Sequence, residues 1–243
     1  MKCVILAAGY ATRLYPLTRN LPKSLLVVAD KTILEHILEK VEEVPEIDEI
    51  FLVSNSKFAG QFSAFLSRYQ VKKPILVLND GTWDNEHRLG AIADLALAIE
   101  QAKIDDDVMV LAGDNLFDFS LKDFTSFFND VQADCITTHY EESLEALNRT
   151  GVAEIGPKCQ VLSFEEKPIN PRSNNAVPPF YIYTKKTIEL IQQFLDIGEN
   201  ADAPGQFVAW LVKKKAIYAY HFKGKRYDIG SVANYQEAKR IFE

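Results

Sequence analysis

The stretch CVILAAGYATRLYPLTRNLPKSLL, residues 3–26, joins an apolar run to a bare loop that is followed by two cations. Residues 3–7 are apolar and end in small side chains, which is typical of a buried central strand. The small residues that follow within 9–12 leave successive backbone N–H groups free to approach an anion. Arg13 and Lys23 lie just beyond. Because open α/β sheets bind ligands at the C-terminal ends of their strands, this pattern favours a polyphosphate site.

Two familiar phosphate-binding motifs are missing from this loop. It has no Gly-x-Gly-x-x-Gly, which excludes the dinucleotide fingerprint, and no Gly-Lys-Ser/Thr, which excludes the Walker loop. On spacing alone, an ordinary strand and loop with surface cations fits equally well.

Composition restricts the class of protein. With 243 residues, 47% apolar and 25% charged, the chain is long enough for one large α/β domain. The net charge of -7 argues against nucleic acid as a partner, so local cations must hold any anionic ligand. No stretch approaches the ~18 apolar residues of a membrane span, and the N-terminal apolar run is too short for a signal peptide.

The three cysteines, Cys3, Cys135 and Cys159, each lie in an apolar stretch. An odd number of such cysteines predicts buried free thiols in a reducing compartment. We therefore expect a cytoplasmic protein without a membrane partner.

Apolar periodicity predicts alternating strands and helices in the first half. Thr32 and Glu35 have capping-box spacing at the start of a helix. Further strands are expected at 50–53, 75–78 and 108–112, and further helices at 58–69 and from about Leu89. This alternation predicts a mostly parallel sheet with helices on both faces.

The second half has shorter connections. Strands are expected at 133–140, 151–155, 161–164, 178–183 and 216–222, and helices at 185–194, 206–213 and 232–242. The short connections suggest added antiparallel strands that wall a pocket. Because no repeat or linker separates the halves, we expect a single domain over residues 1–243.

Two aspartates and one Glu-Lys pair stand out as candidates for chemistry. Asp114 follows the strand at 108–112, and Asp228 precedes the last helix. Each also fits an ordinary role, as a turn residue and as a helix-start acid. Together they would suit Mg²⁺, which takes one or two protein carboxylates and fills its remaining positions with water and phosphate oxygens. Glu166 and Lys167 follow the strand expected at 161–164, where a solvated strand end is the plainer interpretation.

Five motifs in order carry a resemblance to a known family. They are Leu-Ala-Ala-Gly-x-x-Thr-Arg-Leu-x-Pro-Leu-Thr from Leu6, Pro22-Lys23, Gly113-Asp114-Asn115, Glu165-Glu166-Lys167-Pro168 and Asp228-Ile229-Gly230. This pattern resembles the sugar-1-phosphate nucleotidylyltransferases over nearly the whole chain. Ala11 departs from it, because relatives usually have Gly there. If the backbone needs a positive φ at this position, Ala costs roughly 1 kcal/mol.

The resemblance implies a Rossmann-like fold of the GT-A type, with a nucleotide-binding half at 1–130 and a sugar-binding half at 131–243. It implies Mg²⁺-dependent transfer of a nucleotidyl group from an NTP to a sugar 1-phosphate, with glucose 1-phosphate and UTP or dTTP as the favoured pair. Arg13, Lys23 and Asp114 would be catalytic, and Asp114 and Asp228 would hold the metal. Arg13 would contact the β- and γ-phosphates, Lys23 the α-phosphate and Lys167 the sugar phosphate.

The same resemblance assigns the remaining site residues. Nucleotide-binding positions would be Leu6, Ala7, Ala8, Gly9, Tyr10, Ala11, Thr12, Asn79, Arg88, Leu89 and Gly90. Sugar-phosphate positions would be Asn115, Gly151, Glu166, Lys167, Asn175 and Val177. Relatives often have Gly-Leu/Thr-Ala where this chain has Arg88-Leu89-Gly90. Arg88 would then contact a phosphate or ribose, or pair with Glu86.

Two other functions remain open from the sequence. A phosphocholine-type cytidylyltransferase shares the first loop and would need an aromatic cage, for which Trp83, Tyr181 and Tyr183 are candidates. Glu166-Lys167 counts against it. A nucleotide-sugar sensor or regulatory subunit would bind without turnover. In each case the partners are small molecules, with a homo-oligomer possible.

Overall fold

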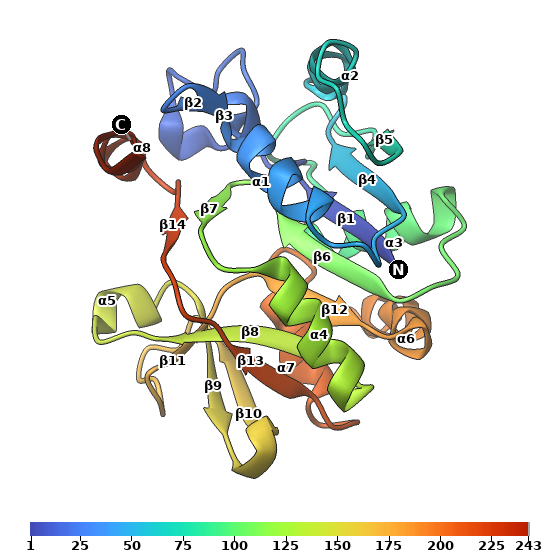
Figure 1. Cartoon of the computed structure of the whole chain (residues 1–243), viewed down its shortest axis with the longest axis vertical. Helices are drawn as coiled ribbons and strands as arrows, with labels where there is room; N and C mark the ends of the chain where they lie inside the picture. Colours follow the sequence, from blue (N-terminus) through green and yellow to red (C-terminus); the bar gives the residue numbers. More distant parts are fainter. Residues whose placement is uncertain (243) are drawn as a thin grey trace.

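The computed structural model describes residues 1–242 and contains a ten-stranded mixed sheet flanked by helices (Figure 1). The strand order is β10-β9-β11-β8-β12-β6-β1-β4-β5, and β13 pairs with β8. The parallel core consists of β1 (Lys2–Leu6), β4 (Glu49–Ser54), β5 (Ile75–Asn79) and β6 (Val108–Ala112). The second half adds β8 (Cys135–Tyr140), β9 (Gly151–Ile155), β10 (Val161–Glu166), β11 (Asn175–Val177), β12 (Phe180–Tyr183) and β13 (Tyr218–His221). This is the predicted fold class.

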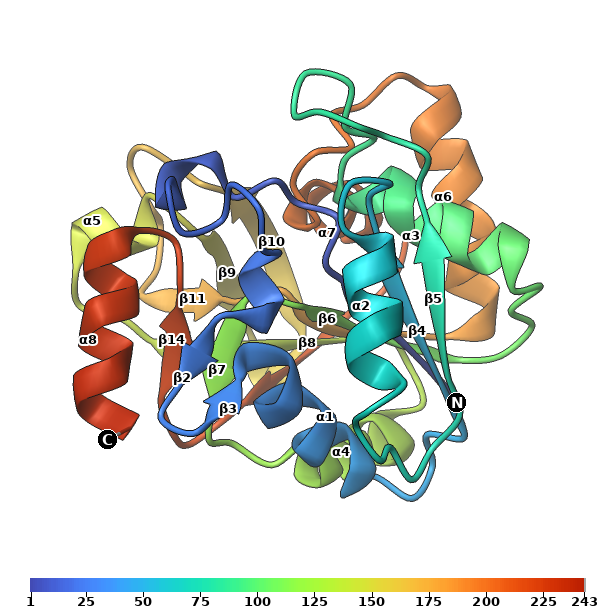
Figure 2. The ribbon, with the colours of Figure 1, turned by 90° about the horizontal axis from the view of Figure 1, so that it is seen from above.

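Helices cover both faces of the sheet, because successive residues of a strand point to opposite sides. Cys3 and Ile5 of β1 belong to a core formed with α1 (Ile33–Glu42), α2 (Ala59–Leu66), α4 (Leu121–Val131) and α8 (Val232–Phe242). Val4 belongs to the opposite core, formed with α3 (Ala91–Gln101), α6 (Lys185–Asp196) and α7 (Gly205–Leu211). Figure 2 shows α3, α6 and α7 on the far side of the sheet from α1 and α4.

Several short elements complete the chain. They are the 3-10 helices η1 (Thr12–Leu14), η2 (Lys23–Leu25) and η3 (Pro157–Cys159), the hairpin β2 (Val27–Val28) with β3 (Lys31–Thr32), the helix α5 (Leu144–Leu147), and the pair β7 (Asn115–Phe117) with β14 (Arg226–Asp228). Among these short elements, the β7–β14 pair contributes most to the position of the candidate site residues, because its register places Asp228 opposite Asn115.

The capping box at the start of α1 is confirmed. The Glu35 N–H donates to Thr32 Oγ1 at 3.2 Å, and the Thr32 N–H donates to Glu35 Oε2 at 2.6 Å. Helix α3 begins at Ala91 rather than near Leu89, because Gly90 adopts a φ of +95° that a helix cannot contain.

The cysteine prediction is wrong at one position. Cys3 and Cys135 are buried free thiols, but Cys159 is exposed. It lies in η3, in the connection between β9 and β10, where the residues on either side of it are also exposed. Among the described residues, no helix has both the length and the apolar character needed to span a membrane.

Candidate active site

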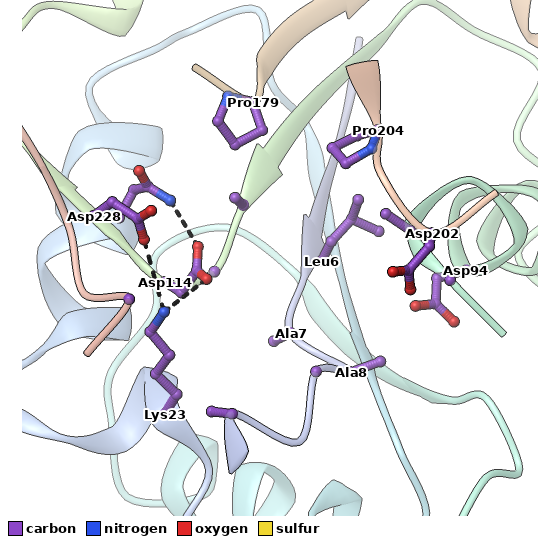
Figure 3. A pocket seen from close by; sticks show the side chains of 18 of the residues that line it. Leu6, Ala7, Ala8, Lys23, Asp94, Asp114, Pro179, Asp202, Pro204 and Asp228 are labelled. Carbon is purple, nitrogen blue, oxygen red and sulfur yellow. Dashed lines mark hydrogen bonds and ion pairs between the residues drawn. The ribbon is translucent and has the colours of Figure 1, made fainter. Parts of the chain in front are cut away.

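A cavity of about 510 Å³ opens at the C-terminal ends of β1 and β6. Figure 3 shows it from close by, with Lys23, Asp114 and Asp228 at one end and Asp94 and Asp202 at the other. Strands from the second half of the chain form its remaining wall. Its volume lies within the range of small-molecule sites.

The first loop presents unpaired backbone donors to this cavity. Within residues 1–242, the N–H groups of residues 8–11 make no hydrogen bond, although Ala8 and Tyr10 are buried. The carbonyl groups of the loop turn into the protein instead, where Asn55 Nδ2 donates to the Ala8 oxygen and Thr18 Oγ1 donates to the Ala11 oxygen, both at 2.7 Å. Free N–H groups facing a cavity are suited to an anion.

Ala11 is held in the left-handed conformation, with φ +47° and ψ +44°. The expected penalty of roughly 1 kcal/mol relative to Gly therefore applies here. Arg13 follows on the lining of the cavity and is exposed, and it forms no ion pair with any described residue. It is a cation available to a ligand.

Lys23 connects the two carboxylates. Its Nζ lies 2.9 Å from Asp114 Oδ2 and 3.8 Å from Asp228 Oδ1 (Figure 3). The lysine side chain is only 10% exposed, whereas both carboxylates are at least 40% exposed towards the cavity. Two acids that are far apart in the sequence thus meet at one ammonium group.

The β7–β14 pairing extends this network. Arg226 Nε donates to Asn115 Oδ1 at 2.5 Å, and Asn115 Nδ2 donates to Asp114 Oδ1 at 2.6 Å. Arg226 Nη2 also lies 3.6 Å from Asp228 Oδ2. Burial by itself would raise the pKa of Asp114, but Lys23, Arg226 and the Asn115 hydrogen bond outweigh it and hold that pKa below its ordinary value.

The donor set at this end fits a hard divalent cation. Asp114 and Asp228 supply carboxylate oxygens, the ligands that Mg²⁺ prefers. In the described part of the chain, no group of three or more His, Cys, Asp and Glu side chains is placed to hold a metal ion. Two carboxylates match a cation that takes its other ligands from water and phosphate.

Glu166 and Lys167 lie on another side of the cavity. The Glu166 side chain is buried, 3.8 Å from Lys167 Nζ, and burial raises its pKa while Lys167 opposes this. Two glycines make room there. A Cβ at Gly151 would collide with the Phe164 ring, and one at Gly205 would collide with the Glu166 carboxylate. The absence of a side chain at Gly151 thus makes room for the Phe164 ring, whereas the sequence predicted that it makes room for a ligand.

Most of the residues predicted for the site line the cavity. They are Leu6, Ala7, Ala8, Gly9, Tyr10, Ala11, Thr12, Arg13, Lys23, Arg88, Gly90, Asp114, Asn115, Gly151, Glu166, Lys167, Val177 and Asp228. The structure brings these together from both halves of the chain.

Three predicted residues lie outside the lining. Asn79 Oδ1 accepts hydrogen bonds from Ser56 and Gly81, Leu89 is 40% exposed, and Asn175 Nδ2 donates to the Ala153 oxygen. These contacts are within the protein or at its surface.

Arg88 lines the cavity but does not pair with Glu86. Its Nε and Nη2 donate to the two carboxylate oxygens of Asp202 at 2.7 and 3.1 Å, and its Nη1 donates to the Asn85 oxygen. The partner is 114 residues away, so local spacing could not indicate it.

Several lining residues were not predicted from the sequence, among them Asp94, Asp202 and Arg226. The sequence could have indicated Arg226. Residues two apart on a strand share a face, and Arg226 precedes the predicted site residue Asp228 by two. Asp94 had no such signal, because its sequence neighbours form an ordinary amphipathic helix.

The three aromatic residues proposed for a quaternary-amine cage do not converge. Trp83 is 69% exposed and lies outside the lining, and Tyr183 is buried against the Phe207 ring. Only Tyr181 of the three reaches the cavity. The cytidylyltransferase alternative therefore loses the feature that supported it.

An α/β sheet with free loop N–H groups after its first strand, and two carboxylates brought together where β7 begins and β14 ends, defines a nucleotide-binding protein that handles phosphate groups. Residues 2–243 match the model of the family described as nucleotidyl transferase. The chain belongs to that family.

Individual relatives agree with this assignment. The chain is 27% identical over 241 residues to the bifunctional protein GlmU of Methanocaldococcus jannaschii, covering 99% of this chain and 54% of that protein. It is 31% identical over 219 residues to a glucose-1-phosphate thymidylyltransferase of Mycobacterium tuberculosis, covering 85% and 67%. The chain thus spans about half the length of the GlmU relatives it matches.

A solved structure shares the whole architecture. UDP-glucose pyrophosphorylase complexed with UDP-glucose superposes with a TM-score of 0.81 at 25% identity, covering 99% of this chain and 97% of that one. The fold of the two chains is the same.

Proposed function

We propose that this protein transfers a nucleotidyl group from an NTP to a sugar 1-phosphate, giving an NDP-sugar and pyrophosphate. The observation that carries the proposal is the meeting of Lys23, Asp114 and Asp228 beside a loop whose N–H groups are unpaired. Membership of the nucleotidyl transferase family supports the same reaction. The favoured substrates are glucose 1-phosphate with UTP or dTTP, because named relatives act on or bind glucose nucleotides of uracil and thymine.

The reaction requires the protein to hold its two substrates in position, and it requires no general base or covalent nucleophile from the protein. A sugar-1-phosphate oxygen is ionised at neutral pH and attacks the α-phosphorus in line, the α–β bridging bond breaks, and pyrophosphate leaves with the electron pair. Two like charges at ~4 Å repel by roughly 4 kcal/mol at an effective dielectric near 20. The cations around the cavity offset this repulsion.

Each cation has a proposed task. Arg13 and the loop N–H groups bind the β- and γ-phosphates, Lys167 binds the sugar phosphate, and Lys23 exchanges its contact with Asp114 for the α-phosphate. Arg226, which faces Asn115 and Asp228, keeps the two carboxylates in position.

Asp114 and Asp228 would hold Mg²⁺. When bound there, the ion neutralises charge on the triphosphate. The two carboxylates lie against the same lysine, so that binding the ion requires no rearrangement of the strands that carry them.

A substrate panel tests the proposal. With Mg²⁺ and glucose 1-phosphate, pyrophosphate release should be fastest with UTP or dTTP, and it should stop when the sugar phosphate is left out. Absence of release with every NTP and a broad set of sugar phosphates, together with NTP binding, would favour a sensor that binds without turnover.

A further inference from the structure

The end of the cavity away from Lys23 is acidic. Asp94, in the first turn of α3, lies there beside Leu6 and Ala8, and Asp202 comes close from the segment before α7 (Figure 3). Asp80, which follows β5, lies near enough for its charge to act on Asp94.

Two of these three acids have their partners within the protein. Asp80 accepts hydrogen bonds from the Thr82 N–H at 2.7 Å and from Thr82 Oγ1 at 3.0 Å, and Asp202 is bound by Arg88. Asp94 differs. Its side chain is 6% exposed, and its Oδ1 is buried without a hydrogen-bond partner. The other oxygen, Oδ2, also has no hydrogen-bond partner among the described residues and is not fully buried, so it is the atom that can reach the cavity. Because buried polar groups are nearly always paired, Asp94 is the acid left to bind a ligand there.

The surroundings of Asp94 favour its neutral form. Burial, and then the charges of Asp80 and Asp202, raise its pKa to about 7. Tyr10 also faces this cluster, Arg88 is bound to Asp202, and the charge of Lys167 acts on Asp202 as well. A neutral carboxyl group carries an O–H donor that a carboxylate lacks.

Charge decides which part of a nucleotide reaches this end. Phosphates are drawn to Arg13, Lys23 and the free loop N–H groups, whereas the guanidinium group of Arg88, near Asp94, is already bound to Asp202. The sugar phosphate has its own cation at Lys167. The uncharged base is the part of the substrate that remains, and it can lie along Leu6 and Ala8 towards Asp94.

We propose that Asp94 determines base specificity: its neutral carboxyl group donates a hydrogen bond to an oxo group of the base, so that the cavity prefers uracil or thymine to cytosine. Uracil and cytosine differ at C4, where one has an oxo acceptor and the other an amino donor. The inference rests on the proposed function, since it takes the ligand to be an NTP.

Equilibrium binding of UTP and CTP, measured by calorimetry with Mg²⁺, tests this inference without requiring turnover. At about pH 6 UTP should bind at least about tenfold more tightly than CTP. Raising the pH to about 8.5 should weaken UTP binding roughly tenfold, because the donor is lost as Asp94 ionises.

Two variants isolate the hydrogen bond. Asp94→Asn keeps a donor at every pH, so UTP should bind within about threefold of wild type at pH 6 and show little pH dependence. Asp94→Leu removes the donor, and the ratio of UTP to CTP affinity should approach one. Asp80→Asn is the matched control, because that buried acid is already bonded to Thr82 and its replacement should leave the ratio unchanged.

Tighter CTP than UTP binding in the wild type, or UTP binding that strengthens with pH, would overturn the inference. So would an unchanged ratio in Asp94→Leu. If that variant does not fold, a strong pH dependence retained in Asp94→Asn would overturn it equally. Failure of pyrophosphate release would contradict the transfer reaction alone, because these binding ratios do not depend on it.

Discussion

Asp114 is the residue on which the proposed reaction depends most. Replacing it with Asn keeps the shape and the contact to Lys23 but removes the negative charge. We expect Asp114→Asn to lower pyrophosphate release by about 10²-fold or more, since the proposed metal position would lose one of its two carboxylates. Circular dichroism should show an unchanged fold. Glu237→Gln, at an exposed acid on α8, is the control and should retain full activity.

Replacing Lys167 should change the KM of one substrate only, the sugar phosphate. Its ammonium group faces the cavity and touches Glu166 at 3.8 Å. Lys167→Ala should raise the KM for the sugar phosphate about tenfold or more and leave the KM for the NTP within twofold, because a charge-assisted contact to phosphate is lost. Initial rates with each substrate varied in turn measure this. An effect confined to the NTP would show that the lysine serves the other phosphate, and Lys186→Ala on α6 is the matched control.

Asp94 should also make stability depend on pH. Its pKa is raised to about 7, mainly by burial, so its ionisation disfavours the folded state. The contribution of the neutral group is complete below the unfolded pKa and is lost as pH rises through 7. Asp94→Asn should therefore be more stable than wild type at about pH 8.5, by up to about 4 kcal/mol, with the difference shrinking towards pH 4. Denaturant titrations at several pH values measure this, and a pH-independent difference would contradict it.

Residues in the recognised motifs could be placed from the sequence, because each motif combines a strand end with a characteristic side chain. Asp114 and Asp228 are examples. Asp94 could not, since an acid in the run AIADLALAIE reads as part of an amphipathic helix. Its burial follows from the segment at 201–202 lying over the start of α3, where the Ala201 oxygen accepts from the Ile92 N–H.

At the scale of elements, Gly205 at the start of α7 sets the position of the Glu166 carboxylate. A Cβ there would overlap that carboxylate, so Gly205→Ala should displace it and raise the KM for the sugar phosphate about tenfold. Gly60→Ala in α2 is the control. A Cβ at Gly60 meets nothing within 4 Å, and this change should stabilise the protein by roughly 0.5–1 kcal/mol without altering kinetics. Kinetics and thermal melts of both variants compare the two sites.

The longer strands could be predicted from the sequence, and the shortest ones could not. Strands β1, β4 and β6 contain continuous apolar runs buried on both faces, and β5, at the edge of the sheet, is also a short apolar run, so composition alone indicated them. The three-residue strands β7 and β14 have no such signal, because each is a strand only through its pairing with the other. Helix α4 was missed although Leu121, Phe124 and Phe128 carry its buried face at helical spacing.

At the scale of the whole molecule, an ion pair between a buried aspartate and a partly exposed lysine lies at the end of the strands opposite the cavity. Asp134 is fully buried and accepts hydrogen bonds from the Thr184 N–H and Thr187 Oγ1 at 2.8 Å, and Lys215 Nζ lies 2.9 Å from it. Tyr183, beside this cluster, pairs with Val108 at the start of β6, whereas the cavity lies at the end of that strand.

We therefore expect that breaking this ion pair lowers the stability of the protein without changing its catalytic rate. Lys215→Met leaves Asp134 buried without its cation and should destabilise the protein by about 3–5 kcal/mol. The kcat per folded molecule should not change, because the site is at the other end of the strands. Urea unfolding and initial rates below the transition measure the two effects. Lys214→Met, which removes only a contact of Nζ with the Trp210 ring, should have a much smaller effect on stability.

The pairing of β14 with β7 has a consequence for how the protein is made. A growing polypeptide that has left the ribosome only as far as Phe222 already carries the nucleotide loop, Lys23 and Asp114, but not the strand that brings Asp228. The proposed metal position then has only one of its two carboxylates. Under the proposed reaction, turnover requires β14 to pair with β7, so a chain that ends at Phe222 should bind nucleotide without consuming it.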